Sequence, residues 1–450
     1  MFRSLYLTLI YGVLLLAGAA APFACALGYI WVDTSSPQHI AYSILTEFPV
    51  SLVMAIATFM SYVAIDRKCP PAPNLLQILM VVTLCWCTFT TFYDPIVPLL
   101  AKSKFDWASR TMLFASFMPF IFRSRLQIEA FLLVFMFAAA IQYMPFGAKT
   151  ILSGGGYHRS FGLLAGNAGL AEGSFLSATC ALLLPLMLYM HRDSLLIPRH
   201  RLLRPLFPGL MVLAVACSIG TYERTALVGL AVALLGMWWR TRNRVTLGVI
   251  GGAAGAVFMA IASQDWLERM STSTQFTSEN SAFVRILVWR WTLDLVKTHP
   301  FGGGFECYRI NEIHIPGING EADIIQHGRA FHSLYFEMLG EQGWPGLALF
   351  LLMIVTTVIT LLLIARWADG DPQFAWLRNL SISLLIGAAA VFACGAFIGI
   401  AYQPVIWYVF ASTVMLNHHM KMCERGAQSA TARGVADPMG AGAWASPGAA

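Results

Sequence analysis

Long and continuously apolar runs constrain this chain more than any other feature. Many of them approach the roughly 20 residues that a helix needs to cross the hydrocarbon core of a bilayer. The sequence is 58% hydrophobic and only 12% charged, whereas soluble domains carry roughly 25% charged residues. A soluble fold has too much surface to hide so much apolar area. The runs do not alternate as barrel strands do, so we expect an all-α, polytopic membrane protein.

We predict about twelve spans from the lengths of these runs. They begin near Leu5, Phe48, Leu75, Asp106, Leu126, Ala168, Leu206, Thr225, Val245, Trp344, Leu380 and Tyr402. The predicted organisation is the first nine spans over residues 1–263, a long polar loop over 264–343, the last three spans over 344–420 and a tail over 421–450. The tail is rich in Ala, Gly, Ser and Pro, and we expect it to be disordered. Long loops between elements are uncommon and usually functional.

Basic residues predict the orientation of the chain in the membrane. They gather after every second predicted span, at Arg67 and Lys68, Arg123 and Arg125, Arg192 to Arg204, Arg240 to Arg244, Arg366 and Arg378, and Lys421 and Arg425. Cytoplasmic loops carry an excess of Lys and Arg. Both termini are therefore expected in the cytoplasm, and the loop over 264–343 on the opposite face.

The long loop contains a predicted helix and a glycine-rich turn. Apolar residues recur with a helical period over 281–299, and the tryptophans there suit a helix that lies at the headgroup level as a lid. Residues 300–305 follow with three consecutive glycines. Their backbone N–H groups can cradle a phosphate, but no Lys-Ser or Lys-Thr pair follows as in a Walker motif. A plain turn is the favoured interpretation.

The loop ends in a block that begins with His332 and Ser333 and continues through Glu337 to Gly343 and Gly346. Ser333 suits the N-cap of a short helix. A histidine at a membrane surface can be an ordinary hydrogen-bonded residue. It can also be a general base, because an unperturbed imidazole titrates near neutral pH. Both interpretations of His332 stay open at this point.

Two further arginines lie on the predicted outer face. Arg224 stands at the mouth of the eighth span next to Glu223, and Arg159 precedes Asn167 in the outer loop before the sixth span. Arg224 can be a snorkelling residue or the partner of Glu223. Alternatively, it can bind an anion at the membrane boundary, because a guanidinium makes bidentate contacts with phosphate.

Together these residues resemble the signature of the O-antigen ligase and polymerase superfamily of bacterial envelopes. In that family a histidine and a small polar residue precede Gly-x-x-Gly at the spacing of His332, Ser333, Gly343 and Gly346. The family is similar in having an arginine at the start of a mid-chain span, here Arg224, and another on a loop helix about fifty residues before the histidine, here Arg285. Its arginine, glycine and Asn-Pro pattern is matched by Arg159, Gly162 and Asn167, although Ala168 replaces the proline. The loop most resembles O-glycosylation ligases found alongside exosortase systems.

The resemblance implies a metal-independent glycosyltransferase of the bacterial inner membrane. Such an enzyme moves a glycan from an undecaprenyl-diphosphate carrier to an acceptor hydroxyl, on a lipid A-core or another glycan or protein acceptor, at the periplasmic face. It implies no cofactor, and no nucleic acid as a partner. His332 would act as the base, and Arg224 and Arg285, with Arg159 and Arg290, would bind the diphosphate. Ser333, Glu337 and Asn167 are supporting residues.

Three alternatives remain open from the residues. A polymerase that joins lipid-linked repeats differs only in its acceptor. A twelve-span transporter usually has matching halves and a long central cytoplasmic loop, whereas the long loop here is late and predicted outside. A non-enzymatic assembly scaffold leaves His332 and Arg224 unexplained.

Overall fold

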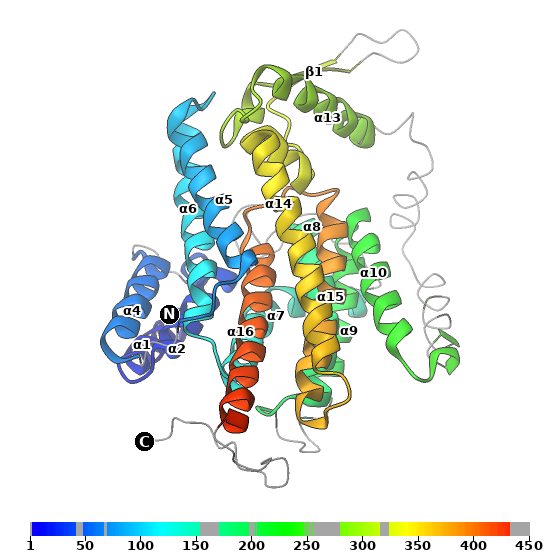
Figure 1. Cartoon of the computed structure of the whole chain (residues 1–450). Coiled ribbons are helices and arrows are strands. Elements are labelled where there is room, and N and C mark those ends of the chain that lie inside the picture. Colours follow the sequence, from blue (N-terminus) through cyan, green and yellow to red (C-terminus); the bar gives the residue numbers. More distant parts are fainter. Residues whose placement is uncertain are drawn as a thin grey trace.

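The computed structural model describes residues 2–41, 48–66, 70–153, 170, 172–197, 203, 205–246, 280–315 and 324–432, with isolated positions between 248 and 255. This part of the chain is mostly helical, as the apolar runs predict (Figure 1). Within it, five helical segments are long and apolar enough to cross a membrane: Leu75–Tyr93, Arg125–Leu152, Gly173–Asp193, Leu334–Trp367 and Pro372–Gly395. The predicted count of about twelve spans is therefore not confirmed.

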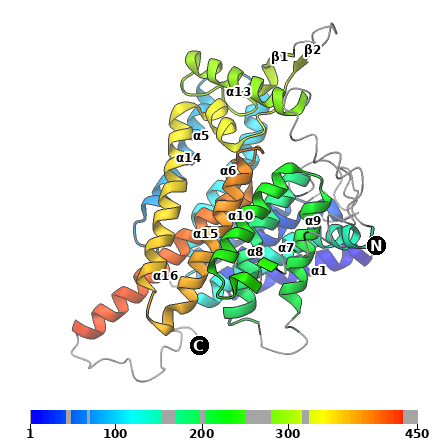
Figure 2. The same cartoon turned by 90° about the vertical axis from the view of Figure 1, so that its right-hand side faces the viewer.

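Most of the described helices stand side by side in one bundle and alternate in direction (Figures 1 and 2). The N-terminal ones are α1 (Phe2–Ala17), α2 (Pro22–Ser35), α3 (Pro37–Ile40), α4 (Val50–Ile65), α5 (Leu75–Tyr93), α6 (Pro98–Phe117), α7 (Arg125–Ser153) and α8 (Gly173–Asp193). They are followed by α9 (Leu206–Gly220), α10 (Arg224–Arg240), α13 (Asn280–Thr298), α14 (Leu334–Trp367), α15 (Ala375–Gly395) and α16 (Pro404–Ala432). The largest interhelical contacts join α8 to α15 and α7 to α9, so these helices form the centre of the bundle.

The first predicted span is wrong as a single helix. The chain breaks between α1 and α2, and the two helices pack against each other. A Cβ on Gly18 would lie 1.8 Å from Cys25 Sγ, so this glycine lets the hairpin close. Pro22 then opens α2, because proline lacks the N–H that a continuing helix would use and suits a first helical position.

Two other helix starts differ from the predictions. Helix α6 begins at Pro98 instead of near Asp106, and α14 begins at Leu334 instead of near Trp344. Both extensions carry charged side chains that a count of apolar residues leaves out. The ninth predicted span, from Val245, lies largely outside the described residues.

Arg123 and Arg125, one of the basic clusters predicted on the cytoplasmic side, bind residues at one end of the bundle. Arg123 pairs with Asp66 at 2.7 Å, Arg125 pairs with Glu129 at 2.8 Å, and Arg125 also donates to the carbonyl of Asp193. These contacts join α4, α7 and α8 at the end of the bundle opposite α13 (Figure 1). The arrangement agrees with the predicted alternation of spans, and the cytoplasmic assignment of this end stays a prediction.

A small cap, residues 280–333, lies across the other end of α14 (Figure 2). Its helix α13 matches the helix predicted over 281–299. The cap core buries Val284 and Val288, while Ile286 and Leu293 stay exposed. The cap also contains an antiparallel hairpin of β1 (Glu312–Ile315) and β2 (Ile324–His327), with Glu312 opposite His327. The all-α prediction missed this hairpin.

Candidate functional site

His332 lies at the junction of the cap and α14, in a left-handed backbone conformation with φ 47°. Such conformations are uncommon outside glycine, cost about 1–3 kcal/mol and persist only where the surroundings enforce them. Ser333 occupies the predicted N-cap of α14 and is buried, but its side chain makes no capping hydrogen bond. His332 is only partly covered by its neighbours and keeps access to solvent.

The residues around His332 are anchored from three directions. Trp289 of α13 donates to the carbonyl oxygen of Phe331 at 2.9 Å, and its ring stacks on Phe336 with a centroid distance of 4.8 Å. Phe331 is buried against Gly340, where a Cβ would lie 2.5 Å from the phenyl ring. On the other side, Leu334 is fully buried. The backbone that carries the imidazole is therefore fixed by packing on both sides.

Two arginines bring positive charge to His332. Burial first, and then the charges of Arg285 and Arg329, lower the pKa of His332 from its usual 6.5 to about 4. The imidazole is therefore neutral at physiological pH and can accept a proton. Arg329 was missed in the sequence, although it stands three residues before the histidine. Buried Asn311 holds its backbone through two hydrogen bonds, of 2.7 and 2.9 Å.

The two arginines predicted on the loop helix have different surroundings. Arg285 lies one turn before Trp289 on α13, and its charge acts on His332. Arg290 is exposed, and at about 100° per residue it is turned about 140° around the helix from Arg285. Its charge acts on Asp294 of the same helix. The structure therefore brings Arg285 to the histidine and leaves Arg290 on another face of α13.

Arg224 begins α10 directly after a tight turn. Helix α9 ends at Gly220, and Tyr222 takes a left-handed conformation with φ 58°. A cation at a helix N-terminus opposes the helix dipole, while the same terminus favours an anion. The helix terminus and the guanidinium can therefore both attract an anion to this position. Arg224 already interacts with neighbouring groups, as does Arg285.

Packing links the start of α10 to the start of α14. The thiol of Cys394 on α15 contacts the carbonyl oxygen of Thr225 at 3.5 Å. The next residue, Gly395, faces Leu334 so closely that a Cβ would lie 1.7 Å from its side chain. Arg224 and His332 are each adjacent to one end of this Thr225–Cys394–Gly395–Leu334 contact chain. Arg224 and His332 therefore lie at the same end of the bundle, with Cys394 and Gly395 at the end of α15 between the starts of α10 and α14.

The glycine-rich turn after α13 clasps a kink in α14. Gly343 is non-helical, with φ 67°, and a Cβ there would lie 2.2 Å from the carbonyl oxygen of Pro300. The N–H groups of Gly302, Gly303 and Gly304 donate to the carbonyl oxygens of His299, Gly340 and Glu341, at 2.8–3.0 Å. Protein carbonyls thus occupy all three donors. This supports the plain-turn interpretation over the phosphate cradle.

A buried ionic cluster underlies the same kink. Lys104 of α6 lies 2.8 Å from both Glu337 and Glu341 of α14, and 3.8 Å from Glu306 of the cap. Glu337 also accepts from the backbone N–H of Ala401 at 3.0 Å. Glu337, predicted as a supporting residue at the site, is therefore bound inside this cluster. Lys104 and Glu341 were missed, although two glutamates spaced i, i+4 at the start of an apolar helix call for a cation.

Gly346, the second glycine of the Gly-x-x-Gly pair, also has a packing role. A Cβ there would lie 2.1 Å from Gln342 Cβ. Trp86 of α5 donates to the carbonyl oxygen of Gln342 at 2.9 Å. Arg159 and Asn167 lie outside the described residues. Across the described ranges, no group of three or more His, Cys, Asp or Glu side chains is placed to hold a metal ion.

The sequence matches two family models that meet near the middle of the chain. Residues 2–195 match a family of unknown function (DUF5935), and residues 209–351 match the O-antigen ligase family. No curated protein matches the chain. The second match contains Arg224, Arg285, Arg329, His332 and the Gly343–Gly346 pair. It supports a membrane enzyme that joins glycans over the transporter alternative. This match covers the cap and the helices on both sides of it, and it supports the resemblance of the chain to the O-antigen ligase superfamily.

Proposed function

We propose that this protein transfers a glycan from undecaprenyl diphosphate to an acceptor hydroxyl at the periplasmic face of the bacterial inner membrane. The observation that carries the proposal is the setting of His332. The backbone of His332 is held by packing on both sides, and the charges of Arg285 and Arg329 help to keep its imidazole neutral. A base next to cations suits a reaction in which an alcohol loses a proton while a diphosphate departs.

Arginine supplies the electrostatic half of the reaction. As the bond between the anomeric carbon and the diphosphate oxygen breaks, negative charge accumulates on the departing diphosphate. Arg285 and Arg329 on the cap, and Arg224 at the start of α10, would bind that charge and stabilise it as it grows. Because guanidinium groups fill this role, the proposed reaction needs no metal ion. Arg159 and Asn167 remain candidates for the same site.

His332 supplies the proton-transfer half. The acceptor oxygen forms a new bond to the anomeric carbon from the face opposite the diphosphate, which inverts that centre. The hydroxyl proton passes to the imidazole, and the diphosphate leaves with the electron pair of the broken bond. Binding of the anionic donor beside Arg285 and Arg329 would raise the pKa of His332 and make it a stronger base at the moment of transfer.

The decisive experiment is transfer in vitro from an undecaprenyl-diphosphate glycan by the purified full-length protein. We expect His332→Ala to reduce turnover by roughly 10²–10⁴-fold, as for loss of a general base. Arg224→Ala and Arg285→Ala should each cost roughly 10²–10³-fold, as for loss of an oxyanion donor. His314→Ala and Arg309→Ala, at exposed positions of the cap, are matched controls that should keep activity. Full activity of His332→Ala would contradict the proposal.

Two further measurements sharpen the assignment. Turnover should be unchanged in EDTA, and strong inhibition would point to a metal ion. A ligase and a polymerase differ in their acceptor, so the products of a deletion strain distinguish them. Glycan chains of normal length that stay on the carrier indicate a ligase, whereas single repeats attached to the acceptor indicate a polymerase.

A further inference from the structure

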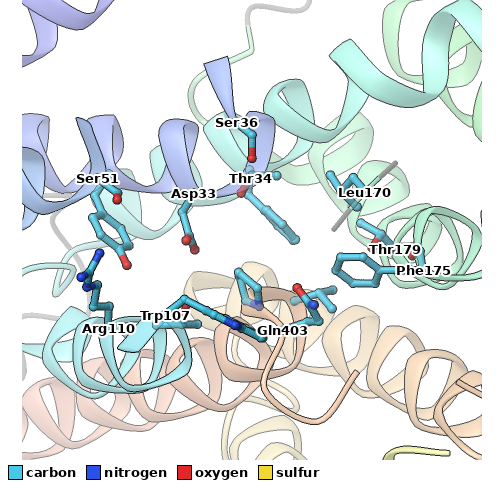
Figure 3. Close-up of a pocket in the computed structure, with 15 residues that line it drawn as sticks. Asp33, Thr34, Ser36, Ser51, Trp107, Arg110, Leu170, Phe175, Thr179 and Gln403 are labelled. Atoms are coloured by element: carbon cyan, nitrogen blue, oxygen red, sulfur yellow. Dashed lines mark hydrogen bonds between the residues drawn. The ribbon is translucent and has the colours of Figure 1, made fainter. Parts of the chain in front are cut away.

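A cavity of about 200 Å³, lined by both polar and apolar side chains, lies in the N-terminal half of the bundle, apart from His332 (Figure 3). All of its lining residues except Gln403, Pro404 and Val405 lie within residues 2–195, the region that matches the family of unknown function. None lies in residues 209–351, which match the O-antigen ligase family. The cavity therefore belongs to a part of the chain to which no activity is assigned.

One wall of the cavity carries hydrogen-bonding groups that are held in place. Tyr408 donates to Asp33 Oδ2 at 2.6 Å, which fixes the carboxylate at the cavity wall. Next to it, the side chain of Thr34 is 7% exposed, and its hydroxyl has no hydrogen-bond partner among the described residues. A buried hydroxyl without a partner costs free energy. This one lines the cavity, where a ligand can satisfy it.

The opposite wall combines an aromatic ring with further polar groups. Figure 3 shows Trp107 and Arg110 of α6 facing Asp33 of α2, with Gln403 near Trp107. Trp107 is 39% exposed, and Arg110 is bound to Asp106 at 2.6 Å. The Arg110 guanidinium is thus already paired, and the Asp33 carboxylate lines the same cavity, which disfavours an anionic ligand such as phosphate. Hydroxyl, amide and carboxylate groups likewise disfavour an acyl chain, because burying them against it leaves them unpaired.

Two sets of contacts connect the cavity to the elements that carry the proposed catalytic residues. Gln403 ends the 396–403 loop, whose Ala401 N–H is bound by Glu337, five residues after His332. On the other side, the cavity is lined by Phe175 in the first turn of α8. The neighbouring Gly173 packs against Thr221 and Glu223, directly before Arg224. The cavity therefore lies between the elements that carry the histidine and Arg224.

We propose that this cavity binds one sugar ring of a glycan substrate, and that the N-terminal region thereby selects the glycan. The inference rests on the proposed glycan transfer. An aromatic ring can pack against the C–H face of a pyranose, while Asp33, Thr34 and Gln403 accept from and donate to its hydroxyl groups. The ring can belong to the donor glycan or to a glycan acceptor, since both present the same chemistry.

The test measures donor and acceptor KM separately for Trp107→Ala and Gln403→Ala in the full-length protein. Both side chains are partly exposed, so these variants are expected to fold. Trp239→Ala, on an exposed tryptophan near the far end of α10, is the matched control. We expect a rise of at least tenfold in one KM, with kcat within threefold of the wild type. A higher donor KM places a donor sugar in the cavity, and a higher acceptor KM places an acceptor sugar there. If neither KM changes, or if only kcat falls, the proposal is overturned.

A binding measurement keeps the proposal testable if the wild-type protein shows no transfer. Saturation-transfer NMR with methyl glycosides of hexoses and N-acetylhexosamines needs no catalysis. A signal from the wild type and from Trp239→Ala that is lost in Trp107→Ala supports the cavity even if the proposed function fails. An equal signal from all three proteins, or no signal from the wild type, overturns it.

Discussion

Replacing Lys104 by methionine should severely destabilise the protein. The ammonium lies 2.8 Å from both Glu337 and Glu341, and the Glu341 side chain is fully buried. Methionine has nearly the same volume as lysine but removes the charge, so the variant leaves two buried carboxylates without their cation. The cap is affected as well, because Glu341 also accepts from the backbone N–H of Glu306 at 2.9 Å.

The expected loss follows from the burial of the cluster. Removing one partner of a buried ion pair costs roughly 3–5 kcal/mol, because the other charge stays buried and uncompensated. With an unfolding entropy of roughly 2 cal/mol/K per residue, a chain of this length should lose about 3–6 °C in its unfolding midpoint. Glu341→Gln in the Lys104→Met background removes one orphaned charge and should restore part of the loss.

Thermal unfolding in detergent, followed by tryptophan fluorescence, measures the effect. Lys297→Met is the matched control, because Lys297 pairs with Asp294 at 2.6 Å while both side chains are more than half exposed. Exposed pairs contribute little, so this control should unfold close to the wild-type temperature. The reasoning is refuted if Lys104→Met is no less stable than Lys297→Met, or if adding Glu341→Gln lowers the midpoint further.

Two other predictions concern the residues around the histidine. Because the pKa of His332 is lowered to about 4, kcat/KM should stay high well below pH 6.5 and fall only near pH 4. Arg329→Gln removes one positive charge, so it should raise this pKa and move the acidic limb of the pH profile to higher pH. An unchanged acidic limb would argue against His332 as the base. The free energy of unfolding should also fall as the pH falls from 6.5 to 4. Over this range His332 binds a proton more readily in the unfolded chain than in the folded protein. Gly343→Ala should abolish transfer and lower the unfolding midpoint, because a Cβ at this left-handed position would lie 2.2 Å from the Pro300 carbonyl oxygen. Gly209→Ala in α9 is the control, because a Cβ there meets open space and the variant should behave as the wild type. Normal transfer by Gly343→Ala would show that the kink is dispensable.

Local patterns predicted the parts of the fold that depend on local sequence. The helical period over 281–299 predicted α13, and the apolar runs after Leu75, Leu126 and Leu206 predicted α5, α7 and α9 closely. The block from His332 to Gly346 was identified from residue types and spacing alone. These features share one property, since each is encoded within about twenty consecutive residues.

Contacts between distant residues were beyond the same reasoning. Lys104 looked like a loop residue because its partners, Glu337 and Glu341, lie more than 200 positions away in the chain. The glycines at 302–304 favoured a plain turn, but nothing local shows that α14 accepts the N–H groups of Gly303 and Gly304. The helical period over 281–299 likewise did not show which face of α13 is buried, because the cap core that covers Val284 and Val288 includes residues of the β1–β2 hairpin.

The clasp between the glycine turn and α14 restricts how substrates can reach His332. Gly303 and Gly304 donate to α14 ahead of the kink, and Trp344 donates back to Pro300 just beyond it. Lifting the cap like a hinged cover would break all three backbone bonds at once. If the protein acts on a polyprenyl-linked donor as proposed, that donor would instead enter laterally from the bilayer, while the glycine turn stays bound to α14.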